Sequence, residues 1–88
     1  MNVEVLFFGQ FRELATRRQV LSLKDDARLV DLIEWLVKEY GDDFRKGISD
    51  PERLHILING QHCDLMDNTK TVLKDSDVVA ILPPATGG

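Results

Sequence analysis

Apolar and polar side chains alternate at the start of the chain, and this alternation predicts a β-strand over residues 3–8. Val3, Val5 and Phe7 share one face of the extended segment, and the opposite face carries two more apolar side chains beside an acidic one. A second extended run follows at residues 19–23 after a polar connection. The two segments are therefore expected to pair as a hairpin.

The clearest element is an amphipathic helix in the first half of the chain. Its apolar positions recur at spacings of three and four residues, at Leu29, Leu32, Ile33, Leu36 and Tyr40. A lysine lies in the final turn and a glycine follows directly, as is common at the carboxyl ends of helices. The helix is therefore expected to end near Tyr40.

The second half of the chain predicts a loop and three short strands. Residues 42–53 are polar and contain several helix breakers, which favours a loop with at most a helical turn. Residues 54–58 and 61–64 are typical of two short strands, joined by the dipeptide Asn59-Gly60 that is favoured in tight hairpin turns. Residues 78–82 form an uninterrupted apolar run that suits a central strand.

The order of these elements predicts an α+β domain over residues 1–82, in which one helix covers one face of a mixed sheet. Pro83 and Pro84 end the last strand, because proline has no amide hydrogen to give to a neighbouring strand. Residues 83–88 are expected to leave the sheet as a flexible tail.

Size and charge limit the functions open to the chain. Its 88 residues fit one domain, and so small a core leaves little room for an internal active site. Eleven basic residues against fifteen acidic ones give a net charge of −4, the wrong sign for binding nucleic acid or an anionic membrane. A basic face on a partner protein is favoured instead. No segment has the pattern of a signal peptide or membrane span, so the protein is expected in the cytoplasm.

Few side chains offer conventional catalytic or metal-binding chemistry. Cys63 is the single cysteine, which excludes an internal disulfide, and packing in the sheet is favoured over a reactive thiol. His55 and His62 flank the predicted tight turn, which allows them to lie near each other. Without a carboxylate or third ligand in the pattern, neither histidine receives a role. Trp35 lies beside the apolar stripe of the helix and is interpreted as a packing residue, with partner anchoring as the alternative. No metal or bound cofactor is expected.

The carboxyl end carries the most specialised chemistry. It forms a narrow segment that reaches about 20 Å when extended and consists of Pro83, Pro84, Ala85, Thr86, Gly87 and Gly88. Glycine has no Cβ, so a partner can close tightly around the last two residues. The prolines fix the exit direction and lower the entropy lost on insertion. For a Gly-Gly dipeptide taken alone, a frayed terminus is the alternative.

Three motifs in the chain carry a family resemblance. Residues 5–14 read Val-Leu-Phe-Phe-Gly-Gln-Phe-Arg-Glu-Leu, and residues 73–88 combine a polar turn, an apolar strand and a Pro-Pro-x-x-Gly-Gly tail. Ile58-Asn59-Gly60 lies between them. Together these motifs resemble the MoaD/ThiS family of sulfur carriers, and most closely MoaD, the small subunit of molybdopterin synthase. The resemblance implies a ubiquitin-like β-grasp fold.

Two positions depart from the family pattern. Arg28 stands where a threonine usually caps the helix, so the cap is expected from another residue such as Asp26. Ser76 stands where glycine is common in the turn before the last strand. We expect Ser76 to strain that turn or to change its type.

The resemblance implies a sulfur carrier that is not an enzyme on its own. An activating enzyme related to ubiquitin E1 adenylates the carboxylate of Gly88 with ATP, and a sulfur donor protein then supplies the sulfur of a thiocarboxylate. A MoaE-type large subunit provides the pocket in which the tail gives this sulfur to a pyranopterin precursor. Docking is expected on the exposed sheet face near the tail, with Phe8 and Leu82 as apolar anchors and Arg12 at the rim. The alternative is that Phe8 and Leu82 belong to the core.

Three destinations for the carboxyl group of Gly88 are compatible with this resemblance. Sulfur donation to molybdopterin is preferred, because the Pro83-Pro84 pair and the Phe7-Phe8 opening resemble MoaD more than ThiS. Thiazole synthesis of the ThiS type is second. Attachment to a lysine of another protein, as in ubiquitin-related and archaeal small modifier proteins, is the third and belongs to a different functional class.

Overall fold

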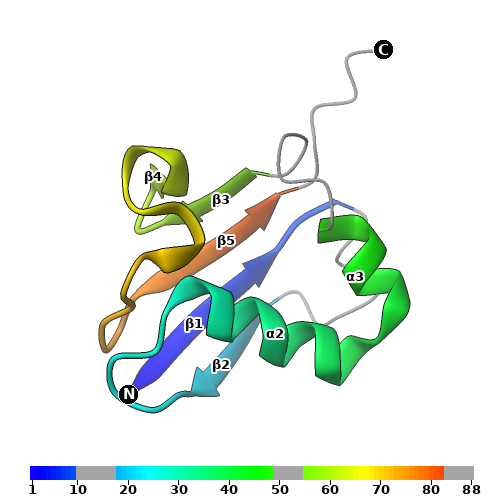
Figure 1. Ribbon diagram of the computed structural model, residues 1–88, viewed down its shortest axis with the longest axis horizontal. Helices are drawn as coiled ribbons and strands as arrows, with labels where there is room; N and C mark the ends of the chain where they lie inside the picture. Colours follow the sequence, from blue (N-terminus) through cyan, green and yellow to red (C-terminus); the bar gives the residue numbers. More distant parts are fainter. Residues whose placement is uncertain (10–17, 49–54, 83–88) are drawn as a thin grey trace.

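The computed structural model describes residues 1–9, 18–48 and 55–82, which form a mixed β-sheet with helices packed on one side (Figure 1). The elements in chain order are β1 (Asn2–Phe7), β2 (Arg18–Ser22), α2 (Leu29–Tyr40), α3 (Asp42–Ile48), β3 (His55–Ile58), β4 (Gln61–His62), the short 3₁₀ helices η1 (Cys63–Leu65) and η2 (Asn68–Lys70), and β5 (Val78–Leu82). None of the helices in these ranges is both long and apolar enough to cross a membrane.

The first and last strands lie side by side at the centre of the sheet. The order across the five described strands is β2-β1-β5-β3-β4, with β5 parallel to β1 and antiparallel to β3. Val5 and Ile58 both lie opposite Val79, and all three side chains are almost completely buried. The central position that the apolar run predicted for residues 78–82 is therefore confirmed.

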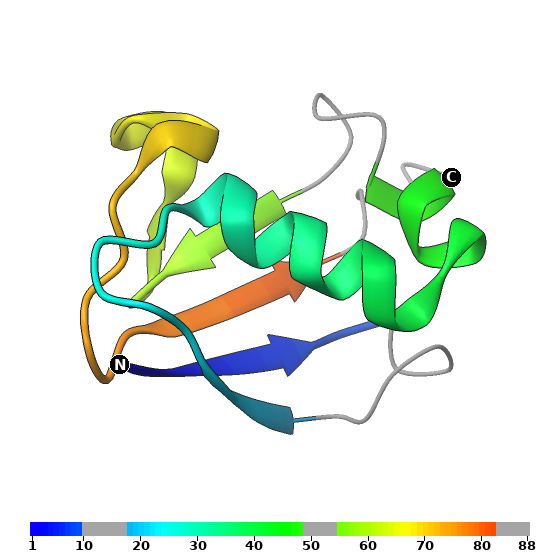
Figure 2. The same ribbon diagram turned by 60° about the horizontal axis from the view of Figure 1, so that its bottom comes forward.

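Helix α2 crosses one face of this sheet, as Figure 2 shows from a second direction. Its stripe residues Leu29, Leu32 and Leu36 are fully buried, and each such side chain contributes roughly 1.5–3 kcal/mol by leaving water. The helix ends where the sequence predicted. The amide of Gly41 donates to the carbonyl of Val37 at 2.8 Å, and Gly41 has a left-handed φ of 87°.

The start of α2 is capped from within the helix, so the expectation that Asp26 supplies the cap was wrong. The backbone N–H of Arg28 donates to the carboxylate of Asp31 at 2.8 Å. The guanidinium of Arg28 donates to the carbonyl of Lys70 at 3.0 Å and ties the helix to η2. Asp26 itself occupies a left-handed turn position with φ of 68°.

A second helix, α3, occupies the first part of the segment 42–53 that the sequence predicted as a loop, so that prediction was wrong for residues 42–48, and residues 49–53 lie outside the described part of the chain. Phe44 is completely buried, with its ring centroid 6.1 Å from that of Phe7 and 5.8 Å from that of Tyr40. Acidic residues in the first turn of α3 and basic residues in the last fit the helix dipole. The burial of Phe44 in this aromatic cluster outweighs the low helix propensity of Gly47 within α3.

The strand predicted over residues 61–64 stops after His62, because the chain turns into η1. The backbone N–H of Asp64 donates to Nδ1 of His62 at 3.1 Å, and the amide of Met66 donates to the carbonyl of Cys63 at 2.9 Å. Cys63 is 8% exposed, so its packing role is confirmed although it lies in η1 and not in a strand.

The turn before β5 contains the strain expected at Ser76, which has φ of 71°. The neighbouring carboxylate of Asp77 accepts from the backbone N–H of Lys74 at 2.8 Å and from Nδ2 of Asn59 at 2.9 Å. The other amide atom, Oδ1 of Asn59, accepts from the N–H of Val78 at 2.9 Å. These bonds hold the β3–β4 turn against the start of β5.

The strand order and the helix across one face define a ubiquitin-like β-grasp fold, so the expected fold class is confirmed.

Candidate docking face and the root of the carboxyl segment

The end of β5 fixes the point from which residues 83–88 continue. Leu82 is the last residue of β5 and lies opposite His55 of β3. Because β1 and β5 are parallel, the carboxyl ends of both strands lie at the same end of the sheet. The N–H of Phe8 donates to the carbonyl of Ile81 at 3.1 Å. The two anchor residues chosen from the sequence, Phe8 and Leu82, therefore lie at the same end of the sheet.

Neither of these two side chains is completely buried. Phe8 is 41% exposed and Leu82 is half-buried. Both therefore have surface available for a partner. Their role as docking anchors stays a prediction.

More apolar side chains lie between this end of the sheet and its middle, on the face opposite α2. Leu6 lies opposite Ala80, and Ala80 lies opposite Leu57 on the next strand. Residues directly opposite each other project from the same side of a sheet. We call this surface the open sheet face, and its apolar members are Leu6, Phe8, Val20, Leu57, Val78, Ala80 and Leu82.

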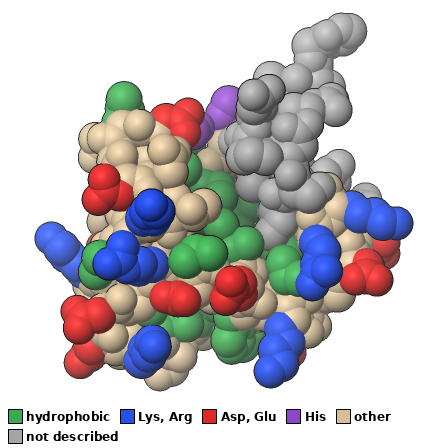
Figure 3. All heavy atoms as spheres, in the orientation of Figure 1, with side chains coloured by type: hydrophobic (Ala, Val, Ile, Leu, Met, Phe, Trp, Pro, Cys, Tyr) green, Lys and Arg blue, Asp and Glu red, His purple; other side chains and the backbone are tan. Residues whose placement is uncertain are grey.

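The open sheet face also carries polar side chains at its two edges. Glu4 and Arg18 form an ion pair beside Leu6, at the β1–β2 edge, and His55 and His62 lie opposite Leu82 and Leu57 at the other edge. On the helical side, acidic and basic side chains are scattered over the surface (Figure 3). Contiguous exposed apolar surface marks protein interaction sites more often than a mixed charged surface does. The open sheet face is accordingly our candidate docking surface.

The sequence interpretation missed Leu6, Leu57 and Ala80 as members of this surface. Each alternates with a fully or nearly buried neighbour in its strand, and each is itself half-buried. The signal was therefore present in the strand alternation, but the register that joins the three residues appears only in the folded sheet.

The remaining predicted site residues lie outside the described part of the chain, so their roles stay predictions. They are Arg12, Pro83, Pro84, Ala85, Thr86, Gly87 and Gly88.

Two other candidates lie away from the open sheet face. Burial raises the pKa of the Cys63 thiol, and the nearby charge of Asp64 raises it further, so the residue is held as a neutral thiol. Trp35 is 37% exposed on α2, on the opposite side of the molecule.

These features define a small β-grasp domain with an apolar sheet face and a glycine-terminated carboxyl segment that follows the central strand. The model of the ThiS family matches residues 5–88, which include both motifs at the ends of the chain. The chain belongs to the ThiS family.

Relatives in this family carry two kinds of name. Small archaeal modifier protein 3 of Haloferax volcanii is 33% identical to this chain, and the match covers 100% of both proteins. The molybdopterin synthase sulfur carrier subunit of Drosophila erecta is 35% identical over 100% of this chain and 92% of its own length.

Solved structures agree with this assignment. A putative molybdopterin converting factor, subunit 1, from Pyrococcus furiosus has a TM-score of 0.80 at 31% identity and covers 96% of this chain and 98% of its own. A complex of subunits 1 and 2 of the molybdopterin-converting factor from Helicobacter pylori contains a chain with a TM-score of 0.65 at 27% identity, with 100% of each chain covered.

Proposed function

We propose that this chain is a sulfur carrier and acts as the small subunit of a molybdopterin synthase. The carrying observation is that the family match extends through Gly88, the residue on which such chemistry depends. Relatives named as molybdopterin synthase sulfur carrier subunits match the whole of this chain. On this proposal the chain is not an enzyme by itself, but the sulfur-donating subunit of a complex.

The chemistry takes place at the carboxylate of Gly88. A carboxylate is a poor electrophile, so an E1-like enzyme first joins it to AMP from ATP and releases pyrophosphate. Sulfur at the sulfide level, delivered by a sulfur donor protein, then forms a bond to the acyl carbon as the bond to AMP breaks, which leaves free AMP and a thiocarboxylate. Its sulfur is a polarizable nucleophile that the chain obtains without using Cys63.

The acceptor pocket belongs to a MoaE-type large subunit on this proposal. The two-subunit complex from Helicobacter pylori supports a partner of this kind. The open sheet face supplies the docking surface, because Phe8 and Leu82 lie at the end of the sheet where residues 83–88 begin. Docking there places the mouth of the partner's pocket within reach of the carboxyl segment.

Reconstitution in two steps tests the proposal. The untagged chain is incubated with its activating enzyme, ATP and a sulfur source, and intact mass is expected to show one sulfur-for-oxygen exchange. The product is then mixed with the large subunit and the cyclic pyranopterin precursor. A dithiolene contains two sulfurs and each chain carries one, so two chains are expected to be consumed for each molybdopterin formed.

Variants of the carboxyl segment serve as controls. A chain that lacks Gly88 is expected to show no mass shift. Gly87→Ala is expected to keep the fold but to slow sulfur transfer, because an added methyl group clashes in a tight tunnel. An equal mass shift without Gly88 would refute the carrier assignment.

A protein-modifier function is the second candidate, favoured by the full-length match to an archaeal modifier. In that case Gly88 ends in an isopeptide bond to a lysine of another protein. Recovery of lysine-linked conjugates from cells, together with failure to form the dithiolene, selects this function. Transfer of the sulfur into a thiazole selects the ThiS-type alternative.

A further inference from the structure

Two imidazole rings meet at the β3–β4 edge of the sheet. Nδ1 of His55 lies 3.2 Å from Nε2 of His62, with the rings almost perpendicular at 83°. The tight turn between the strands fixes this contact, because Asn59 and Gly60 take left-handed φ values of 52° and 84°. The sequence placed the two histidines on either side of this turn but could not show that they touch.

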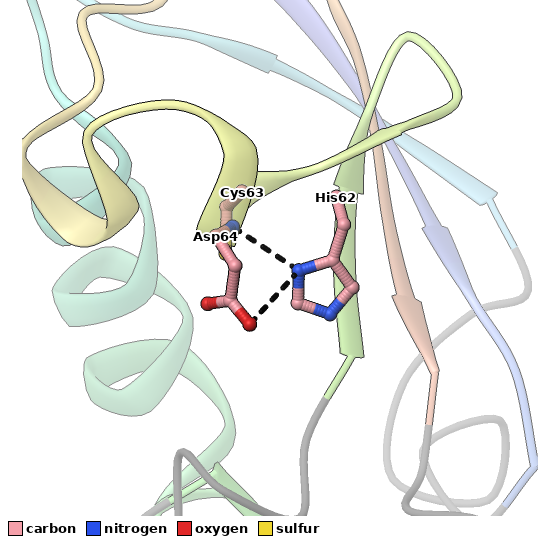
Figure 4. A group of neighbouring side chains, drawn as sticks. All are labelled: His62, Cys63 and Asp64. Atoms are coloured by element: carbon pink, nitrogen blue, oxygen red, sulfur yellow. Dashed lines mark hydrogen bonds and ion pairs between the residues drawn. The ribbon is translucent and has the colours of Figure 1, made fainter.

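The carboxylate that was missing from the sequence pattern comes from η1. After His62 the chain turns back, so that Oδ2 of Asp64 lies 3.5 Å from Nδ1 of His62, which also accepts the backbone N–H of Asp64 (Figure 4). The side-chain ligand atoms of His62, Cys63 and Asp64 lie within 4.8 Å of one another. Two imidazoles and one carboxylate are therefore assembled over a single short hairpin.

We propose that His55, His62 and Asp64 form a binding site for Zn²⁺, with the two imidazoles as direct ligands and the carboxylate as the group that orients His62. Nitrogen ligands about 2.0–2.1 Å from a tetrahedral zinc ion lie about 3.3 Å from each other. The observed separation of 3.2 Å between Nδ1 of His55 and Nε2 of His62 already matches that spacing. Imidazole nitrogen is also a ligand type that suits zinc.

The hydrogen bonds around His62 show how the site accepts an ion. Nδ1 of His62 accepts the N–H of Asp64, so the ring proton lies on Nε2, between the two imidazoles. Zn²⁺ replaces this proton, which moves to Nδ1 of the same ring. There the carboxylate of Asp64 accepts it in place of the present backbone contact. A carboxylate behind a metal-bound imidazole fixes its orientation and raises its basicity.

The exposure of each side chain to water decides which neighbouring groups can bind the ion. The side chain of Asp64 is 73% exposed and that of His62 is 26% exposed, so water can complete the coordination of the ion. Cys63 is 8% exposed and belongs to the buried core cluster, so it is left out of the proposed ligand set.

Titration of the tag-free chain with Zn²⁺ alone, followed by calorimetry near neutral pH, tests the site. We expect one ion per chain, a loss of affinity of about tenfold or more in His55→Ala and in His62→Ala, and a loss of about 10–100-fold in Asp64→Asn. Cys63→Ala is expected to bind as the unaltered chain does. Asp67→Asn is the matched control, because it removes an exposed carboxylate outside the cluster and is expected to change nothing.

Side-chain ¹⁵N resonances give a second measurement that does not depend on affinity. Zinc is expected to shift the imidazole nitrogens of His55 and His62 together, at one ion per chain. Circular dichroism of each variant checks that its fold is retained, and His55→Ala is the decisive variant because His55 is exposed. Absence of binding to the unaltered chain, or unchanged binding in His55→Ala, would overturn the proposal. The test needs neither sulfur nor a partner, so it is independent of the proposed function.

Discussion

Asn59 and Ser76 both hold left-handed backbone angles beside Asp77, but they use their side chains differently. Asn59 bonds through both atoms of its amide, to Asp77 and to the N–H of Val78. The hydrogen bond described for Ser76 uses its backbone N–H, which donates to the carbonyl of Asn2 at 2.8 Å. Of these two residues, Ser76 is therefore the one that bears the conformational strain without a side-chain hydrogen bond described for it.

Glycine is expected to have opposite effects at these two positions. Ser76→Gly should stabilise the protein by about 0.5–1 kcal/mol, because glycine tolerates a positive φ that costs other residues about 1–2 kcal/mol. Asn59→Gly should destabilise it by about 1–2 kcal/mol through the lost hydrogen bonds. Urea denaturation of both variants measures the two changes, and effects of the same sign would contradict this account of the turn.

Cys63 is expected to react slowly with thiol reagents in the folded protein. It is 8% exposed, and its raised pKa lowers the fraction of thiolate, which is the reactive form. The rate of reaction with a disulfide reagent at neutral pH should therefore be much lower than the rate for the same chain in denaturant. Equal rates would show that η1 opens readily.

The raised pKa of Cys63 also determines how the stability of the protein changes with pH. The folded pKa lies above the ordinary value of 9.0, so the unfolded chain loses its proton first as the pH rises. The stabilising contribution of Cys63 is complete below that value and is lost as the pH rises through the folded pKa. Cys63→Ala is expected to remove this alkaline component of the denaturation profile.

At the scale of elements, the carboxyl ends of β1 and β5, next to residues 83–88, are expected to control docking. Phe8→Ala and Leu82→Ala should each weaken binding to the large subunit about tenfold or more, because large apolar side chains near the centre of an interface carry much of its binding energy. Trp35→Ala is the control, since it removes a comparable exposed aromatic side chain from the helical side. Calorimetry with the large subunit measures all three. Equal weakening by Trp35→Ala would place the interface elsewhere.

Elements with a strong period were predictable from the sequence, and elements that depend on tertiary contacts were not. The stripe of α2 and the apolar run of β5 carry their own signal. Helix α3 is short and contains Gly47, and its stability comes from the burial of Phe44 against Phe7 and Tyr40. The sequence of residues 42–48 alone does not predict that contact.

The candidate docking surface, too, could be predicted only in part from the sequence. Phe8, Leu82 and the terminal glycines could be chosen from composition and family motifs. The row through Leu6, Ala80 and Leu57 depends on strand register, which pairs residues far apart in the sequence. The contact of Asp64 with His62 arises because η1 replaces the expected strand.

At the scale of the whole molecule, the net charge of −4 is expected to act on the rate of association. An acidic carrier and a basic partner face attract each other over distances that salt shortens. The association rate constant with the large subunit should fall as ionic strength rises, while the dissociation rate constant changes little. Stopped-flow measurements over a range of salt concentrations provide the test, and an association rate that rises with salt would contradict it.

The central position of β5 also bears on how the protein is made. β5 is the last of the described strands to be synthesised, yet it lies between β1 and β3 and supplies Val79 and Ile81 to the core. Until it leaves the ribosome, β1 and β3 each have an unpaired edge, and the chain cannot close its sheet. A chain truncated before Val78 is therefore expected to stay unfolded and open to proteases. A chain that stops before Val78 therefore lacks both the central strand and the glycine at which the proposed chemistry takes place.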